Sequence, residues 1–332
     1  MTAYYRPLVQ HGRLRPDAAM TLAGQNLWFT QAERLQRGRI SQIVEAVDIP
    51  VEQLDRLTQP RPPIAGLDMA QPQIMGILNA TPDSFSDGGR HNSVDAARAA
   101  AVDMVAHGAS ILDIGGESTR PGADFVPEDK EISRTQPLIE AIRAASDTLI
   151  SIDTRKARVA KAAQEAGAGL INDVSGFTFD PQLAPFCAQV KAPVCVMHMQ
   201  GDPATMQDEP YYDDVLLDVY DFLDGQIAHL EGLGLSRDLI VVDPGIGFGK
   251  NTDHNLRLLQ NLSLFHGLGC PILLGVSRKG FIGQIGKEPR KDARAPGSIA
   301  VALAGLSQGV QIIRVHDVAE TAQALRLWAA VR

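Results

Sequence analysis

The amino-acid sequence predicts an α/β fold, a (β/α)8 TIM barrel with a small N-terminal appendage. Three features predict it. Eight short apolar runs of strand length recur after residue 70, helix-like segments lie between most of them, and polar residues gather where the runs end. Runs that are apolar on both faces are typical of buried parallel strands. Eight such β-then-α units favour a closed barrel over the alternative, an open doubly wound sheet.

The first unit is residues 1–70, which we expect to be an extension whose role the sequence does not indicate. Its apolar groups are short and scattered, and QPRPP at 59–63 is typical of a linker. Residues 71–332 are predicted to form the barrel. A segment of about 70 residues buries too little surface to support a second active site of its own.

The barrel strands are predicted from the apolar runs in chain order. They are IMGIL (74–78), SILDI (110–114), TLISI (148–152), GLIND (169–173), PVCVM (193–197), LIVVD (239–243), PILLGV (271–276) and QIIRV (311–315). The first helix is predicted to start with Ser93 as its N-cap and to end at Gly108, and another ends at Gly167. GSIAVALAGLSQG and VAETAQALRLWAAV are the last two helical segments.

Composition excludes several classes of partner. The 332 residues carry a formal net charge of −8, which argues against a broad basic surface for nucleic acid. The apolar runs are all shorter than the roughly 18 residues that a membrane span requires. Cys187, Cys195 and Cys270 are odd in number and lack metal-binding spacing, so we expect buried free thiols and a cytoplasmic protein.

Polar residues stand at the carboxyl ends of nearly all the predicted strands, where (β/α)8 barrels carry their chemistry. Arg314 and His316 are two residues apart and therefore share one face of the last strand. With Lys279 at the end of the seventh strand, they indicate an anion site. The alternative for Arg314 is a structural ion pair with Asp317 or another acid at this end.

Three further strand ends carry Asp153, Asn172 and Asp243. Their oxygens could accept paired hydrogen bonds from the ring N–H and amino groups of a flat heterocycle. The alternative is a set of helix N-caps, with Asp153 capping the helix that starts near Lys156. For Glu117 we favour a role in fixing its own loop over a role as a base.

The segment DPGIGFGK (243–250) matches neither the spacing of a P-loop nor that of a dinucleotide-binding turn. Its glycines are better explained by a sharp turn or by close approach of the backbone to a ligand, on which Phe248 could stack. His198 stands alone at its strand end, so we expect no transition-metal site there.

The motifs together resemble the dihydropteroate synthases. GILNATPDSFSDGG, GGESTRPGA, ISIDT, LINDVSG, VMHMQGDPATMQ, DPGIGFGKN, GVSRKGFIG, PGSIA and IIRVHD follow that family's order over residues 74–317. The resemblance implies that 6-hydroxymethyl-7,8-dihydropterin diphosphate is joined to p-aminobenzoate, which releases diphosphate. It also implies small-molecule substrates, Mg²⁺ and a homodimer.

The resemblance implies roles for individual residues. Asn79 would contact Mg²⁺, and the diphosphate would be held by Thr119, Arg314 and His316. The pterin would be held by Asp153, Asn172, Asp243 and Lys279. The p-aminobenzoate site would be lined by Phe85, Arg120, Pro121, Phe248 and Ser277. Asp83 would stabilise the electron-poor CH₂ of the pterin as diphosphate leaves, so the implied catalytic residues are Asp83, Thr119, Arg120 and Lys279.

The sequence departs from the family at two positions. Ala80 stands where Val is more frequent, which changes packing. Gly280 stands where many members have Ser beside the p-aminobenzoate carboxylate, so we expect weaker binding of p-aminobenzoate by about 1 kcal/mol.

Three other functions fit the sequence less well. A pterin-binding protein without catalysis should have lost the loops TPDSFSDGG and ESTRPG first, and both are intact. A corrinoid methyltransferase domain has no use for the diphosphate site that Arg314 and His316 imply. A bifunctional enzyme would need more than residues 1–70 for its second activity.

Overall fold

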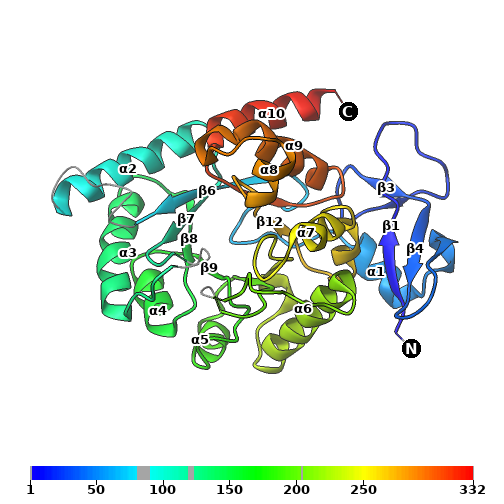
Figure 1. Ribbon diagram of the computed structural model, residues 1–332, viewed down its shortest axis with the longest axis horizontal. Coiled ribbons are helices and arrows are strands. Elements are labelled where there is room, and N and C mark those ends of the chain that lie inside the picture. Colours follow the sequence, from blue (N-terminus) through cyan, green and yellow to red (C-terminus); the bar gives the residue numbers. More distant parts are fainter. Residues whose placement is uncertain (1, 81–89, 119–122, 203–204, 332) are drawn as a thin grey trace.

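The computed structural model describes residues 2–331 except 81–89, 119–122 and 203–204 (Figure 1). Eight parallel strands lie side by side in the order β11-β10-β9-β8-β7-β6-β13-β12. A parallel bridge from Val242 in β11 to Ile272, just before β12, joins the two ends of this sheet. The predicted barrel is therefore confirmed, and the open doubly wound sheet is excluded.

Each barrel strand coincides with one of the predicted apolar runs. The strands are β6 (Gln73–Asn79), β7 (Ile111–Gly115), β8 (Leu149–Asp153), β9 (Leu170–Asp173), β10 (Val194–Met197), β11 (Ile240–Asp243), β12 (Leu273–Leu274) and β13 (Ile312–Val315). Their residues are almost all buried, because helices cover the outer face while side chains fill the interior. This two-sided burial explains the continuous apolar runs.

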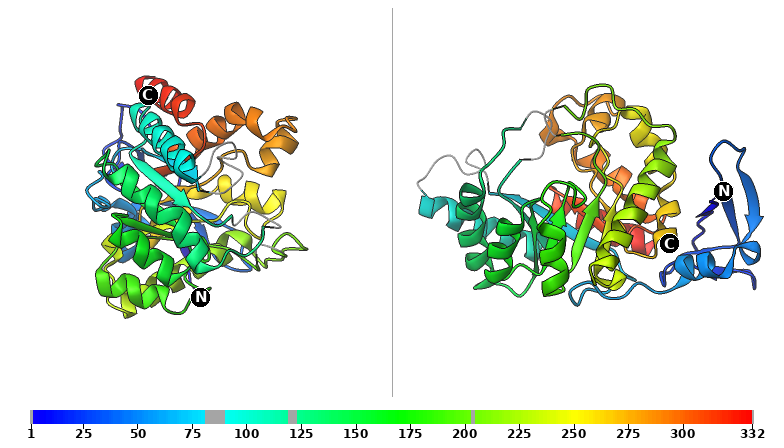
Figure 2. Two further views of the ribbon diagram at one scale, coloured as in Figure 1. Left: turned by 90° about the vertical axis from the view of Figure 1, so that its left-hand side faces the viewer. Right: turned by 90° about the horizontal axis from the view of Figure 1, so that it is seen from below.

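Helices surround the sheet (Figures 1 and 2). They are α2 (Arg90–Ala106), α3 (Glu128–Arg143), α4 (Ala157–Glu165), α5 (Leu183–Val190), α6 (Val215–Gly232), α7 (Thr252–Leu259), α8 (Gly280–Ile285), α9 (Ala295–Leu306) and α10 (Val318–Ala330). The N-cap prediction for Ser93 was wrong, because α2 already begins at Arg90. Gly108 and Gly167 follow their helices with φ of 114° and 113°, a conformation that glycine adopts without steric cost.

The amino-terminal end of the barrel is filled by apolar side chains. The inward residues of this layer are Met75, Ile111, Leu170, Cys195, Val241, Leu273 and Ile312, all fully buried or nearly so. Ile64 and Met69, both 0% exposed, pack against them from the segment that precedes β6. Residues 64–69, which were assigned to the appendage, thus close the bottom of the barrel.

The appendage has its own small core and lies beside the barrel (Figure 2). Its elements are β1 (Tyr4–Pro7), β2 (Met20–Thr21), β3 (Trp28–Phe29), β4 (Gln31–Leu35), β5 (Gln42–Glu45) and α1 (Val51–Thr58). It docks on α6 and on the 3₁₀ helix η4 (Leu262–Leu268). The Tyr4 hydroxyl donates to Asp221 over 2.8 Å, and Ser263 Oγ donates to the Pro7 carbonyl over 2.9 Å.

Two predictions concern the cysteines and the apolar segments. The three cysteines are free and buried, as expected. In the part of the chain that the structure describes, every helix is too short or too polar to cross a membrane.

Candidate active site

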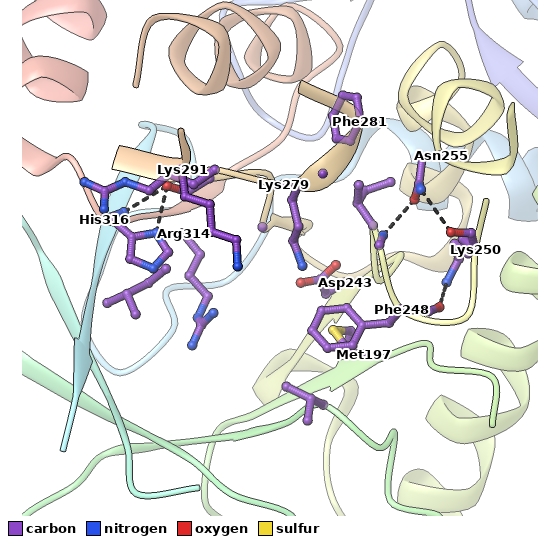
Figure 3. Close-up of a pocket in the computed structure, with 18 of the residues that line it drawn as sticks. Met197, Asp243, Phe248, Lys250, Asn255, Lys279, Phe281, Lys291, Arg314 and His316 are labelled. Carbon is purple, nitrogen blue, oxygen red and sulfur yellow. Dashed lines mark hydrogen bonds between the residues drawn. The ribbon is translucent and has the colours of Figure 1, made fainter. Parts of the chain in front are cut away.

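A pocket of about 720 Å³ opens at the carboxyl ends of the barrel strands. Figure 3 shows that residues from different strands converge on it, with Arg314 and His316 on one side, Phe248 and Lys250 on the other, and Lys279 and Asp243 between them. The sequence predicted that the site lies at this end of the barrel, because polar residues stand at the carboxyl ends of so many strands.

The floor of the pocket is an ion-pair cluster around Arg314. Its Nε donates to Asp113 Oδ2 over 2.6 Å, and its Nη2 donates to Asp153 Oδ2 over 2.7 Å. Ser151 Oγ donates to the other oxygen of Asp113 over 2.6 Å. Asn172 Nδ2 lies 3.4 Å from both Asp113 oxygens. Arg314 therefore holds two carboxylates, Asp113 and Asp153, next to each other.

Asp113 was not among the predicted site residues. The signal for it was an acid inside the apolar run SILDI, two residues after the inward-facing Ile111. Side chains two apart on a strand share a face, so Asp113 had to point into the barrel. A buried carboxylate there is costly unless it is paired. Its partner, Arg314, comes from the other end of the chain.

The alternative for Arg314, a structural ion pair with Asp317 or another acid at this end, is confirmed for other acids, whereas Asp317 pairs with Arg278. Arg314 does pair with acids at this end of the barrel, namely Asp113 and Asp153. Arg278 has a φ of 59°, and its backbone N–H is fixed by Ser298 Oγ over 2.8 Å. The left-handed conformation turns this side chain toward Asp317, while its neighbours Ser277 and Lys279 line the pocket.

Two carboxylates that line the pocket, Asp153 and Asp243, have raised pKa values. Burial raises the pKa of Asp153, against the opposing charge of Arg314. Burial also raises the pKa of Asp243 to about 6, although Gly245 N–H donates to this carboxylate over 2.7 Å. Asp153 Oδ1 is buried with no hydrogen-bond partner among the described residues. Such an atom can accept a hydrogen bond from a ligand in the pocket.

Asp153 does not cap a helix, so the N-cap alternative was wrong for it. The first helical N–H of α4, at Ala157, donates to Asp180 over 2.7 Å instead. Asn172 and Asp243 stand at the same level of the barrel and also line the pocket. The neighbouring Asp173 has a structural role, since it accepts from the backbone N–H groups of Ser175 and Phe177.

The ends of the last two strands and the loop after β11 supply further predicted pocket residues. Ser277 Oγ lies 2.9 Å from His316 Nδ1 and accepts from the His316 backbone N–H over 3.1 Å. The Lys279 ammonium lies 4.0 Å from the centroid of the Phe248 ring. The face of the Phe248 ring thus lies next to the Lys279 ammonium, on the side of the pocket formed by the loop after β11.

The loop after β11 is held by a buried lysine that the sequence did not single out. Lys250 Nζ donates to the carbonyls of Gly245 and Phe248, over 2.9 and 3.0 Å, and lies 2.8 Å from His198 Nδ1. Gly245 and Gly249 have positive φ, and a Cβ there would collide with the backbone carbonyls of His198 and Gln200. These glycines serve a sharp turn against β10, which was one of the two explanations considered.

Glu117 fixes its own loop, as expected. Its Oε1 accepts from the Val126 N–H over 2.9 Å, and its Oε2 pairs with Arg155 and with the buried Lys156, each over 3.1 Å. Burial opposes ionisation, but the Val126 N–H and Arg155 lower the pKa of Glu117. The carboxylate is thereby occupied with structural partners.

The structure does not test every predicted site residue. The predictions for Asp83, Phe85, Thr119, Arg120 and Pro121 lie outside the described residues. Asn79 ends β6 and lines the pocket. The described residues contain no group of three or more His, Cys, Asp or Glu side chains that could hold a metal ion by themselves.

Comparisons with known proteins bear on this site. The model of the pterin binding enzyme family matches residues 75–316. The chain is 47% identical over 262 residues to the dihydropteroate synthase of Escherichia coli K12, which covers 79% of this chain and 92% of that protein. It is 43% identical over 258 residues to the Bacillus subtilis enzyme, with 78% and 88% covered.

Solved structures agree with the sequence comparison. A Yersinia pestis dihydropteroate synthase in complex with a sulfonamide drug has a TM-score of 0.76 and 47% identity, over 80% of this chain and 96% of that one. A Xanthomonas albilineans dihydropteroate synthase with 4-aminobenzoic acid has a TM-score of 0.77 and 44% identity, over 82% and 98%. The family match covers the strands and strand-end residues that build the pocket. The chain therefore belongs to the dihydropteroate synthase family of pterin binding enzymes.

Proposed function

We propose that this protein is a dihydropteroate synthase that condenses 6-hydroxymethyl-7,8-dihydropterin diphosphate with p-aminobenzoate to give 7,8-dihydropteroate and diphosphate. The observation that carries the proposal is the floor of the pocket. Asp113, Asp153, Asn172 and Asp243 offer convergent oxygens, and one of them, Asp153 Oδ1, is buried without a partner in the described residues. A relative from Xanthomonas albilineans has been solved with 7,8-dihydropteroate.

The pterin would bind edge-on to this floor. A ring N–H and the neighbouring amino group of the pterin can donate two parallel hydrogen bonds, and the two oxygens of one carboxylate can accept them. Asn172 can both donate and accept, which suits a heterocycle that carries both kinds of group. Lys279, above the Phe248 ring, would add a donor at the side of the pterin.

The diphosphate would lie on the side of Arg314 and His316, with Thr119 as a further contact. Asn79 would hold Mg²⁺ together with diphosphate oxygens and water. The side-chain oxygen of Asn79 suits this ion, because Mg²⁺ takes oxygen ligands, keeps several waters and is commonly bound through substrate phosphates. When bound, Mg²⁺ neutralises charge on the diphosphate and so favours its departure.

The reaction breaks the C–O bond to diphosphate, which leaves with the electron pair, and forms a C–N bond to the arylamine. The CH₂ carbon becomes electron-poor as the bond breaks, and Asp83 would stabilise it as a nearby negative charge. The loops TPDSFSDGG and ESTRPG would exclude water, which competes with the arylamine. The arylamine is already a nucleophile and loses its proton afterwards, so no Ser or Cys nucleophile is needed.

p-Aminobenzoate would bind toward the outer part of the pocket, lined by Phe85, Arg120, Pro121, Phe248 and Ser277. Sulfonamides have the shape and charge distribution of this substrate, and a Yersinia pestis relative has been solved with one. We therefore expect sulfonamide to raise the apparent KM for p-aminobenzoate. An unchanged KM would reject this part of the proposal.

A homodimer is part of the proposal, and α9 supports it. This helix, APGSIAVALAGL, carries no charged residue, and its outward Pro296, Ala300 and Ala304 are exposed. A helix that is apolar all round is normally buried on all sides. Ala300→Glu should convert a dimer into monomers in sedimentation experiments, and an unchanged mass would count against α9 as the interface. A cytoplasmic location, which the three free thiols support, also belongs to this proposal.

The decisive experiment is diphosphate release from 6-hydroxymethyl-7,8-dihydropterin diphosphate and Mg²⁺, with and without p-aminobenzoate, in wild type and Asp83→Asn. Release that yields 7,8-dihydropteroate and drops sharply in the variant would support both the activity and the role of Asp83. Pterin binding without release from wild type would favour a non-catalytic pterin-binding protein.

A further inference from the structure

The pocket must accept a diphosphate, which brings several negative charges, yet most of its cations are already engaged. Arg314 is held between two carboxylates, Asp113 and Asp153. With both acids ionised, this cluster of three has no net positive charge. A ligand anion beside this cluster would be attracted by Arg314 but repelled by Asp113 and Asp153, which lie at similar distances from the anion. The net attraction would therefore be small.

Other cations that line the pocket are also committed. Arg278 pairs with Asp317. Arg294 is 9% exposed and donates to the backbone carbonyls of Glu288 and Pro289, over 2.9 and 2.8 Å. Lys250 is 2% exposed and donates to the loop after β11. Each of these cations is already bound to backbone carbonyls or to a carboxylate of the protein.

Lys291 differs from them. It begins the 3₁₀ helix η5 (Lys291–Ala293), in the loop between α8 and α9, and it lines the pocket. Figure 3 shows its side chain extending into the pocket on the side of Arg314 and His316. Within the part of the chain that the structure describes, its ammonium has no hydrogen bond or ion pair. The buried Arg294, three residues later, fixes the backbone of this loop.

We propose that Lys291 binds the diphosphate of the pterin substrate and discriminates it from pterins without a diphosphate. The inference rests on the proposed function. A lysine ammonium is a compact charge with three donors and can follow several phosphate oxygens. Negative charge on the leaving group grows as the C–O bond breaks, so this contact strengthens toward the transition state.

The carboxylate of p-aminobenzoate is the competing ligand for this lysine. The placement of the side chain argues against it. Lys291 lies on the β13 side of the pocket with His316, whereas the aromatic face of Phe248 lies on the opposite side (Figure 3). An arylamine ring near Phe248 would thus lie across the pocket from Lys291, whereas a diphosphate beside His316 would lie on the same side as Lys291.

The test compares Lys291→Met with a matched control, Arg290→Met. Arg290 is the adjacent exposed cation, does not line the pocket and pairs with Glu288 over 3.3 Å. We expect Lys291→Met to raise the KM for the pterin diphosphate about five- to tenfold, as for a lost charged hydrogen bond. The Kd of inorganic diphosphate with Mg²⁺, measured by calorimetry, should rise by a similar factor. The KM for p-aminobenzoate should change less than about twofold, and Lys291→Arg should restore most of the affinity.

Two results would overturn the inference. One is a wild-type Kd for inorganic diphosphate in Lys291→Met, and the other is a selective rise in the KM for p-aminobenzoate. If wild-type protein forms no dihydropteroate, the proposed function fails, while the calorimetric comparison with inorganic diphosphate still decides the role of Lys291.

Discussion

Two layers of the barrel interior, only two residues apart along the strands, have opposite chemistry. The lower layer is apolar, and Ile64 and Met69 seal it from below. One step further along the same strands, the inward residues are Ile77, Asp113, Asn172, Met197, Asp243 and Arg314. Side chains two residues apart on a strand point to the same face, so both sets face the barrel interior. The two layers therefore differ only in the types of residue at these positions.

This contrast divides stability from activity. The lower layer gains free energy by burying apolar surface without polar atoms to satisfy. The upper layer buries carboxylates, which lowers stability but provides acceptors for a ligand, and burial raises the pKa of one of them, Asp243. Mutations in the two layers should therefore affect different measurements.

The largest expected effect is in the lower layer. Met69→Ala should lower the free energy of unfolding by about 2–5 kcal/mol, because a fully buried side chain is replaced by a cavity. Denaturant unfolding measures this, and kcat/KM at a temperature where the variant is folded should stay near wild type. Leu14→Ala, at a 93% exposed position, is the control and should unfold like wild type. A large loss of kcat/KM in Met69→Ala would contradict the division.

In the upper layer, Arg314→Met should lower kcat/KM at least about 100-fold, or about 2.7 kcal/mol. The reason is that Asp113 and Asp153 lose the group that orients them. Stability should fall as well, because two buried carboxylates lose their cation, but the loss of activity should persist at temperatures where the variant is folded. Steady-state kinetics and unfolding on the same preparation measure both. The control is Arg158→Met, which removes a surface ion pair with Glu128 and should remain active. Wild-type kinetics in Arg314→Met would contradict the assignment of activity to the upper layer.

The pH dependence of the upper layer gives a third test, through Asp243. Burial raises its pKa from 3.8 to about 6. Between these values the folded protein holds a proton that the unfolded chain has released. The contribution of Asp243 to stability is therefore full below pH about 4 and is lost as pH rises through about 6. We expect the unfolding free energy of wild type relative to Asp243→Asn to fall by about 1–3 kcal/mol over this range.

Pterin affinity should change in the opposite direction. An ionised Asp243 accepts hydrogen bonds, so the affinity of wild type relative to Asp243→Asn should rise as pH rises from about 5 to 7. Unfolding and pterin titrations at matched pH values measure both trends. Parallel pH curves for wild type and variant would show that Asp243 does not titrate in this range.

The smallest expected effect lies at the upper edge of the pocket. A Cβ on Gly280 would have no atom within 4 Å, so Gly280→Ser fits without rearrangement. The new hydroxyl should lower the KM for p-aminobenzoate up to about fivefold, equivalent to about 1 kcal/mol. Gly225→Ser on α6, where the same open space exists, is the control. An unchanged or higher KM in Gly280→Ser would count against a missing hydrogen bond at this position.

Most of the barrel could be predicted from the sequence because strand burial is a local pattern. All eight apolar runs became strands, and most of the polar residues that ended them now line one pocket. Asp113 was missed because it lies within a run rather than at its end. Ser93 was misassigned because helix boundaries depend on the residues before them, and α2 extends back to Arg90.

The sequence by itself determined the number and order of strands, the end of the barrel that carries the chemistry, and the family to which the motifs belong. Only the tertiary structure decided which charges meet. Arg314 pairs with Asp113 across 201 residues, Arg278 takes Asp317, and Lys291 extends into the pocket without a partner in the described chain. Local patterns depend on neighbours within a few residues, whereas these pairings exist only once the barrel closes and brings its second, third and last strands to one mouth.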